Sequence, residues 1–154
     1  MRSLAIIDAW TRLRGVERFT DGIRREEPGA CQTASMSFSR ISLEGRLTVI
    51  AGPQPPSDDG FCSDRIQVLH WRVDEPYGDD GTHLHRTSDE VYVVLEGAID
   101  LEIDGSPITV TAGEAVTVGA GISHALVSVQ HPARGLTIRG PAINDKVVTD
   151  RRTL

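Results

Sequence analysis

The stretch HLHRTSDEVYVVLEG, residues 83–97, contains two histidines two positions apart, a glutamate five positions later and a closing glycine. On a β-strand, side chains at i and i+2 point to the same face. His83 and His85 therefore project together, with their imidazoles close enough to share one ion, while Leu84 points the other way. The chain has only five histidines, so this pair at the head of a strand is a candidate ligand pair.

The residues that follow this stretch predict further strands. In AIDLEIDG, residues 98–105, apolar Ile99, Leu101 and Ile103 alternate with acidic residues, which is the period-two pattern of a half-buried strand. Asp104-Gly105 is a hairpin turn signal. This part of the chain is thus expected to contain a half-buried strand that ends in a hairpin turn.

Short apolar runs separated by Gly, Pro and Asp turns occur along most of the chain. We predict strands at 47–51, 66–73, 91–97, 98–105, 106–113, 114–119, 123–129, 135–140 and 146–148. Strands of this length at this spacing, with no long helical period between them, are typical of an all-β sandwich or closed barrel.

Composition narrows the function classes. The chain has 154 residues, enough for one domain with a real core, and a formal net charge of −6. An acidic chain argues against a general nucleic-acid binder, which needs a basic face. No apolar run approaches the length of a membrane span, and the N-terminus has no signal-peptide core, so we expect a cytoplasmic protein without membrane contact. We expect Cys31 and Cys62 to be free thiols, although a disulfide between them is conceivable.

A third histidine and the glutamate complete a candidate metal site. Glu90 lies across the bend from the histidine pair, in phase with Tyr92, and GISHALVSV supplies His124, in phase with Leu126 and Ser128. If the barrel closes, three nitrogens and one carboxylate oxygen can converge. Such a set suits Fe, Mn, Ni, Co, Cu or Zn and leaves coordination positions open for water or substrate.

These residues resemble the cupin superfamily. Its first motif is G-x5-H-x-H-x(3,4)-E-x6-G, and His83, His85, Glu90 and Gly97 match its core in full, although Gly78 is one position too close to His83. The second motif, G-x5-P-x-G-x2-H-x3-N, is matched at Gly113, Gly121 and His124, with Gly119 in place of proline and Ser128 in place of asparagine. Fifteen residues separate Gly97 from Gly113, which is typical of small bacterial members.

The resemblance is clear over residues 78–128. It implies an antiparallel double-sheet jelly-roll barrel, with residues 46–150 as the barrel and 1–45 as a short N-terminal extension that belongs to the same domain or to a dimer contact. It also implies one divalent transition metal inside, held by His83, His85, Glu90 and His124. Glu90 has a second reading, as a catalytic general base beside a three-histidine site.

Other residues are weaker candidates. Tyr92, Leu126, Ser128 and Trp71 are candidates for lining a pocket, and Trp71 also suits the core. His70, in IQVLHWRV, is expected to be an ordinary strand histidine rather than a metal ligand. The sequence does not say which face of that strand meets the interior.

The resemblance favours a metal-dependent enzyme that acts on a small organic substrate, as an oxygenase or a cyclase or isomerase. The metal would polarise the substrate or bind O₂. The alternative is a non-catalytic cupin that binds or senses a small molecule; a storage cupin fits less well, because such members tend to lose the ligands. We also expect a homodimer, since exposed barrel edges favour pairing.

Overall fold

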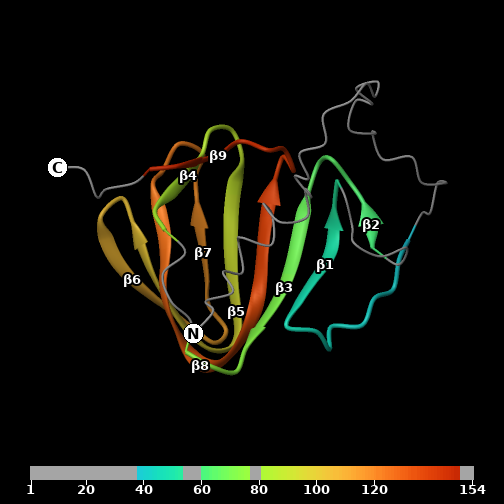
Figure 1. The fold of residues 1–154 in the computed structure, drawn as a ribbon, viewed down its shortest axis with the longest axis horizontal. Coiled ribbons are helices and arrows are strands. Elements are labelled where there is room, and N and C mark those ends of the chain that lie inside the picture. The colour runs from blue at the N-terminus through green and yellow to red at the C-terminus, as the bar shows by residue number, and fades with distance from the viewer. Residues whose placement is uncertain (1–37, 54–59, 77–80, 150–154) are drawn as a thin grey trace, which may run out of the picture.

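The computed structural model describes residues 38–53, 60–76 and 81–149, and Figure 1 shows their arrangement. Within these residues the secondary structure consists of strands alone. The strands are β1 (Leu47–Gly52), β2 (Phe61–Cys62), β3 (Gln67–Val73), β4 (His83–His85), β5 (Asp89–Ile103), β6 (Ser106–Thr111), β7 (Ala115–Val118), β8 (His124–Gly140) and β9 (Lys146–Val148). No helix suited to crossing a membrane occurs in this described part.

Two long strands, β5 and β8, form a central two-stranded ribbon in the barrel. They pair with each other in antiparallel register along nearly their whole length, from Asp89↔Gly140 to Ile103↔His124. We predicted each as two strands, 91–97 with 98–105 and 123–129 with 135–140. The structure instead continues each strand through its middle, with register shifts between Val94 and Ala98 that let the ribbon bend.

The two halves of this ribbon belong to two layers. In the first layer, the start of β5 pairs with the end of β8. There β7 pairs with β5 on one side, and β3 pairs with β8 on the other side, followed by β1 and β2. The half with the end of β5 and the start of β8 is extended by β6 on one side and by β4 and β9 on the other. The all-β jelly-roll barrel expected from the sequence is therefore confirmed, with one amendment: β1 and β2 run parallel.

Glycines occupy the bend of β5 and the tight turn between β5 and β6. Gly97, with φ +74°, lies at the bend of β5, where a Cβ would come within 2.4 Å of the Pro132 carbonyl oxygen. The turn at Asp104 and Gly105 has positive φ at both residues, 49° and 77°, as the predicted tight hairpin requires.

The core fills the space between the layers with aliphatic side chains and two aromatic ones. Its buried members are Trp71, Val73, Tyr92, Val94, Ile99, Leu101, Val110, Val118, Leu126, Val129 and Ala133. Three predicted pocket residues, Trp71, Tyr92 and Leu126, are thus packed in this cluster.

Some expectations concern residues that are not described. The predicted extension is one of them, because residues 1–37 lie outside the described residues, so the division at residues 45 and 46 stays a prediction. The expectation of free thiols is wrong for Cys62, which forms a disulfide bond; Cys31 lies outside the described residues.

Candidate metal centre

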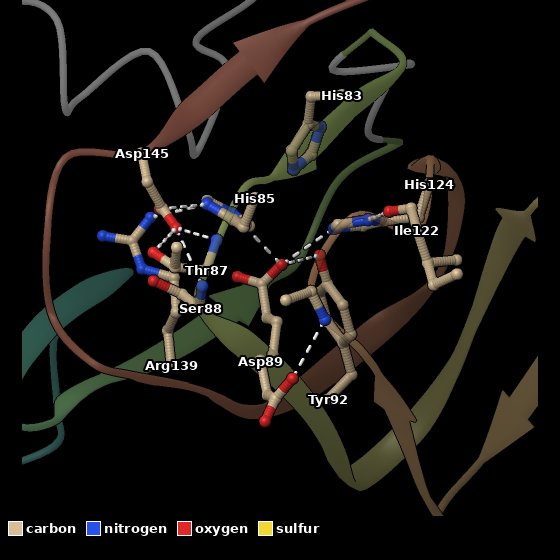
Figure 2. A network of polar contacts seen from close by, with 12 residues as sticks. His83, His85, Thr87, Ser88, Asp89, Tyr92, Ile122, His124, Arg139 and Asp145 are labelled. Carbon is tan, nitrogen blue, oxygen red and sulfur yellow. Dashed lines mark hydrogen bonds and ion pairs between the residues drawn. The ribbon is translucent and has the colours of Figure 1, made fainter.

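Four side chains from three strands meet inside the barrel. His83 and His85 come from β4, Glu90 from β5 and His124 from the first position of β8. Each offers one ligand atom, these atoms all lie within 4.8 Å of one another, and all four residues are buried. Figure 2 shows the rings of His83, His85 and His124 turned toward a common centre.

Strand register accounts for this convergence. His83 and His124 are direct partners across β4 and β8, and their ring centroids lie 4.3 Å apart. His85 shares the face of His83, as the alternation of strand side chains predicts. Glu90 approaches from the other layer, and its Oε2 lies 2.9 Å from His124 Nε2 and 3.7 Å from His85 Nε2.

The hydrogen bonds of the three imidazoles select one tautomer. His83 Nδ1 lies 3.1 Å from the Gly81 carbonyl oxygen, and His124 Nδ1 lies 3.0 Å from the Ile122 carbonyl oxygen. His85 Nδ1 lies 2.9 Å from Asp145 Oδ1. Since carbonyl and carboxylate oxygens only accept, each Nδ1 carries the proton and donates it. In the neutral rings Nε2 is therefore left with a lone pair, as a metal ligand needs.

Burial favours the neutral, ligand-ready form of two of the histidines. The pKa of His83 is lowered to about 3, chiefly by burial and then by the charge of Lys146. Burial also lowers the pKa of His85, although Glu90 and Asp145 oppose the shift. Burial alone would raise the pKa of Glu90, but the hydrogen bond with His124 and the nearby histidine charges lower it below its usual value. Neutral His83 and His85 and an ionised Glu90 are the protonation forms that coordinate a cation.

The donor set fits a transition-metal ion. With Nδ1–H bound to Ile122, the Nε2 lone pair of neutral His124 would face Glu90 Oε2 across 2.9 Å, and two acceptors at that distance repel unless a proton or a cation lies between them. Three imidazole nitrogens and one carboxylate suit Fe, Mn, Ni, Co, Cu or Zn. This buried group of His83, His85, Glu90 and His124 could hold such an ion.

Tyr92, predicted as a pocket candidate, lies beside this group. It follows Glu90 by two residues on β5 and shares its face, and its phenol donates a hydrogen bond of 3.1 Å to Glu90 Oε2. Its ring centroid is 6.2 Å from that of His124. Tyr92 is buried, so its hydroxyl and the carboxylate form a hydrogen-bonded pair inside the barrel.

Ser128 is not brought to this group. The register shift between Asp100 and Leu101 places a bulge in the ribbon, so that Leu126 stays on the inner face while Ser128 turns outward. Its hydroxyl donates a 2.6 Å hydrogen bond to Asp100 Oδ2 instead. His70 also stays apart: it is buried on β3, between Thr48 and Leu136 in register, and is not a member of the four-residue group.

Two residues near the group were not predicted from the sequence. Asp145, just before β9, contacts His85, and Arg139, near the end of β8, places Nη1 3.3 Å from His85 Nδ1. Strand alternation could have indicated Arg139, because it is in phase with buried Ala133 and Gly135. Nothing local marks Asp145, since it follows a turn and its contact joins residues far apart in sequence.

Comparisons with known proteins agree with this architecture. The family model described as "Cupin domain" matches residues 70–139, which span β3 to the end of β8. This chain contains a cupin domain. The predicted membership is thus confirmed, and the matched range contains all four residues of the candidate metal centre.

Solved cupin-like structures share the fold at low identity. Streptomyces Pac13, described as a nucleoside dehydratase, aligns with a TM-score of 0.51 and 15% identity over 60% of this chain and 74% of its own. KdgF from a Halomonas species aligns with a TM-score of 0.52 and 16% identity over 73% and 98%. An uncharacterised protein with a double-stranded β-helix domain from Klebsiella pneumoniae gives 0.52 and 15% over 75% and 93%. No curated protein matches.

Proposed function

We propose that this cupin is a metal-dependent enzyme that acts on a small organic molecule. The observation that carries the proposal is the donor geometry: Nδ1 of each of three buried histidines is engaged by a fixed acceptor, and a buried carboxylate stands against their Nε2 side. Burying these four polar side chains away from water costs folding free energy, and a bound ion would offset that cost.

The proposed holding residues are His83, His85, Glu90 and His124. A divalent ion bound there would act as a Lewis acid that polarises an oxygen of the substrate. All four residues are buried, which limits the access of water and strengthens electrostatic effects at the site.

Among the reactions that cupins carry out, we favour acid–base chemistry of the isomerase, cyclase or dehydratase type over oxygenase chemistry. The supporting observation is the Tyr92–Glu90 pair, a phenol and a carboxylate joined by a hydrogen bond at the edge of the proposed site. Glu90 can accept a proton through Oε2, and Tyr92 can return one to the substrate. Pac13, described as a nucleoside dehydratase, is an example of an enzyme on a barrel of this kind.

Metal analysis tests this proposal. Protein purified without a metal-affinity tag is expected to carry, or to take up on reconstitution, about one equivalent of a divalent transition metal, measured by elemental analysis. His124→Ala is expected to lose it. His131→Ala is the matched control, because His131 is an exposed histidine of the same strand, outside the four-residue group. No metal in the unaltered protein under either condition would overturn the proposal.

Substrate screening then separates the reaction types. A panel of small carbonyl, hydroxy-acid and nucleoside compounds is incubated with the metal-loaded protein, and product mass and O₂ consumption are followed together. Products of unchanged mass, or lighter by one water, without O₂ consumption would support acid–base chemistry. Stoichiometric O₂ consumption would assign oxygenase chemistry, and binding of a compound without turnover would favour a sensing cupin. The expected homodimer stays a prediction, to be checked by light scattering.

A further inference from the structure

Asp145, beside the candidate metal centre, has a carboxylate that accepts four hydrogen bonds. Its side chain is only 7% exposed. Oδ1 accepts a hydrogen bond from His85 Nδ1 at 2.9 Å. Oδ2 accepts from the backbone N–H groups of Thr87 and Ser88 at 2.9 and 2.8 Å and from the Thr87 hydroxyl at 3.0 Å. Figure 2 shows these contacts gathered on the side of His85 away from His124.

The two oxygens of this carboxylate accept hydrogen bonds from different kinds of donor. The donors at Oδ2 include two backbone N–H groups, which cannot turn away or become acceptors. They fix the carboxylate in place and orient Oδ1 toward the imidazole. An ionised carboxylate oxygen only accepts, so at 2.9 Å His85 Nδ1 must carry a proton.

Arg139 is the competing neighbour of this nitrogen. A guanidinium N–H donated to His85 Nδ1 would demand the opposite tautomer, with the proton on Nε2. Its distance of 3.3 Å is longer than the 2.9 Å to Asp145. The opposite tautomer would also set the Nδ1 lone pair against a carboxylate oxygen at 2.9 Å, which is repulsive. The charge-assisted bond to Asp145 therefore decides the tautomer.

Asp145 also joins the ligand strand to the strand that follows it. The Arg86 backbone N–H donates to the Asp145 carbonyl at 3.3 Å. From Lys146 on, β9 pairs with β4, with Lys146 opposite His85 and Val148 opposite His83. The carboxylate is thus held by the backbone on both sides of His85, and its position relative to that ring is fixed by the fold.

We propose that Asp145 is a positioning residue that fixes His85 as the Nδ1–H tautomer and thereby presents the Nε2 lone pair to the metal. The part that concerns metal binding rests on the function proposed above. Acceptors behind metal-ligating histidines commonly change metal affinity 10- to 100-fold when removed, and we expect a loss of about that size here.

Asp145→Asn is the most specific test, because it keeps the shape of the side chain and replaces one acceptor oxygen by an NH₂ donor. The amide oxygen must face the N–H groups of Thr87 and Ser88, since an NH₂ group there would oppose two donors. The NH₂ group then faces His85 Nδ1 and requires its lone pair. The proton moves to Nε2, the atom that the metal needs. The substitution is therefore expected to invert the His85 tautomer.

The experiment measures tautomer and metal affinity separately. Long-range ¹H–¹⁵N correlation spectra of the metal-free protein report which nitrogen of His85 is protonated, with His85→Gln used for assignment. Titration with Co²⁺ gives affinity and, from the visible absorption, the coordination of the ion. Thr149→Val is the matched control: it removes the 3.4 Å hydrogen bond from the Thr149 hydroxyl to the Thr82 carbonyl but keeps the Thr149 backbone N–H bond to the same carbonyl, and neither bond involves Asp145.

The proposal expects Nδ1–H in the unaltered protein and in Thr149→Val, Nε2–H in Asp145→Asn, and Co²⁺ binding about 10- to 100-fold weaker in Asp145→Asn alone. An unchanged tautomer in Asp145→Asn, an inverted tautomer with unchanged Co²⁺ affinity, or equal losses in Thr149→Val would each overturn it. If the unaltered protein binds no Co²⁺, the proposed function fails and the metal-binding role fails with it, while the spectra still decide the tautomer.

Discussion

His83 and His124, which belong to different ends of the cupin motif region, are direct register partners, and their ring centroids lie 4.3 Å apart. The pairing of β4 with β8 is short, and this one residue pair is its only register contact among the described residues. The two imidazoles are therefore placed by the backbone rather than by side-chain rotation. A site built in this way is pre-organised, because the ligands do not have to be gathered when an ion arrives.

Replacing Glu90 by Gln tests the carboxylate of the group. The amide keeps the size of the side chain and can still accept the hydrogen bond from Tyr92, but it brings no negative charge to an ion. We expect metal affinity to fall by more than the roughly 10- to 100-fold that is usual for residues behind a ligand, while the thermal midpoint of the metal-free protein stays the same or rises, because a buried charge is removed. Calorimetric titration and thermal melts measure the two effects. Unchanged affinity would remove Glu90 from the ligand set.

Tyr92→Phe tests the proposed proton donor. It removes one hydroxyl and its 3.1 Å hydrogen bond to Glu90 but keeps the buried ring. We expect a stability loss of about 1 kcal/mol, unchanged metal content and, once a substrate is known, a kcat lower by about 10²- to 10⁴-fold with loss of one limb of the pH–rate profile. A normal kcat with the full pH profile would show that the phenol only packs.

Much of the site could be predicted from the sequence because its information is local. The His-x-His spacing and the strand period placed His83 and His85 on one face, and the motif resemblance added Glu90 and His124. Ser128 was misplaced because a bulge changes the phase between Leu126 and Ser128, and one register shift reverses every later side chain. Asp145 carried no signal, because its role depends on β9 pairing with β4, a contact between distant segments.

Gly135→Ala tests the close approach of β8 to β3 and β5. A Cβ at this position would lie 2.2 Å from the Val93 carbonyl oxygen and 2.4 Å from Trp71 Cζ2. Neither the backbone nor the packed indole can move away easily, so we expect a loss of at least about 3 kcal/mol in the free energy of unfolding. Gly119→Ala is the control, since the nearest atom to its Cβ would be 4.0 Å away. Equal stability of the two variants in urea would contradict the tight packing of this interface.

The stability of the metal-free protein is expected to fall on acidification, beginning near the ordinary histidine pKa. His83 has a pKa of about 3 in the folded protein, against 6.5 as the reference value. Between these two values the unfolded chain binds a proton that the folded chain does not, so the free energy of unfolding decreases as pH falls from about 6.5 toward 3. The lowered pKa of His85 acts in the same direction. We expect a total loss of a few kcal/mol, measured by urea unfolding at a series of pH values.

A variant separates His83 from the other titrating groups in this experiment. His83→Gln cannot gain the proton, so its unfolding free energy should depend less steeply on pH between 6.5 and 4.5, whereas His131→Gln, at an exposed position, should keep the original slope. Below about 4 the lowered pKa of Glu90 adds a further loss in both variants, because protonation of its carboxylate then favours the unfolded chain. Identical slopes in His83→Gln and His131→Gln above pH 4.5 would show that His83 is not held neutral in the folded barrel.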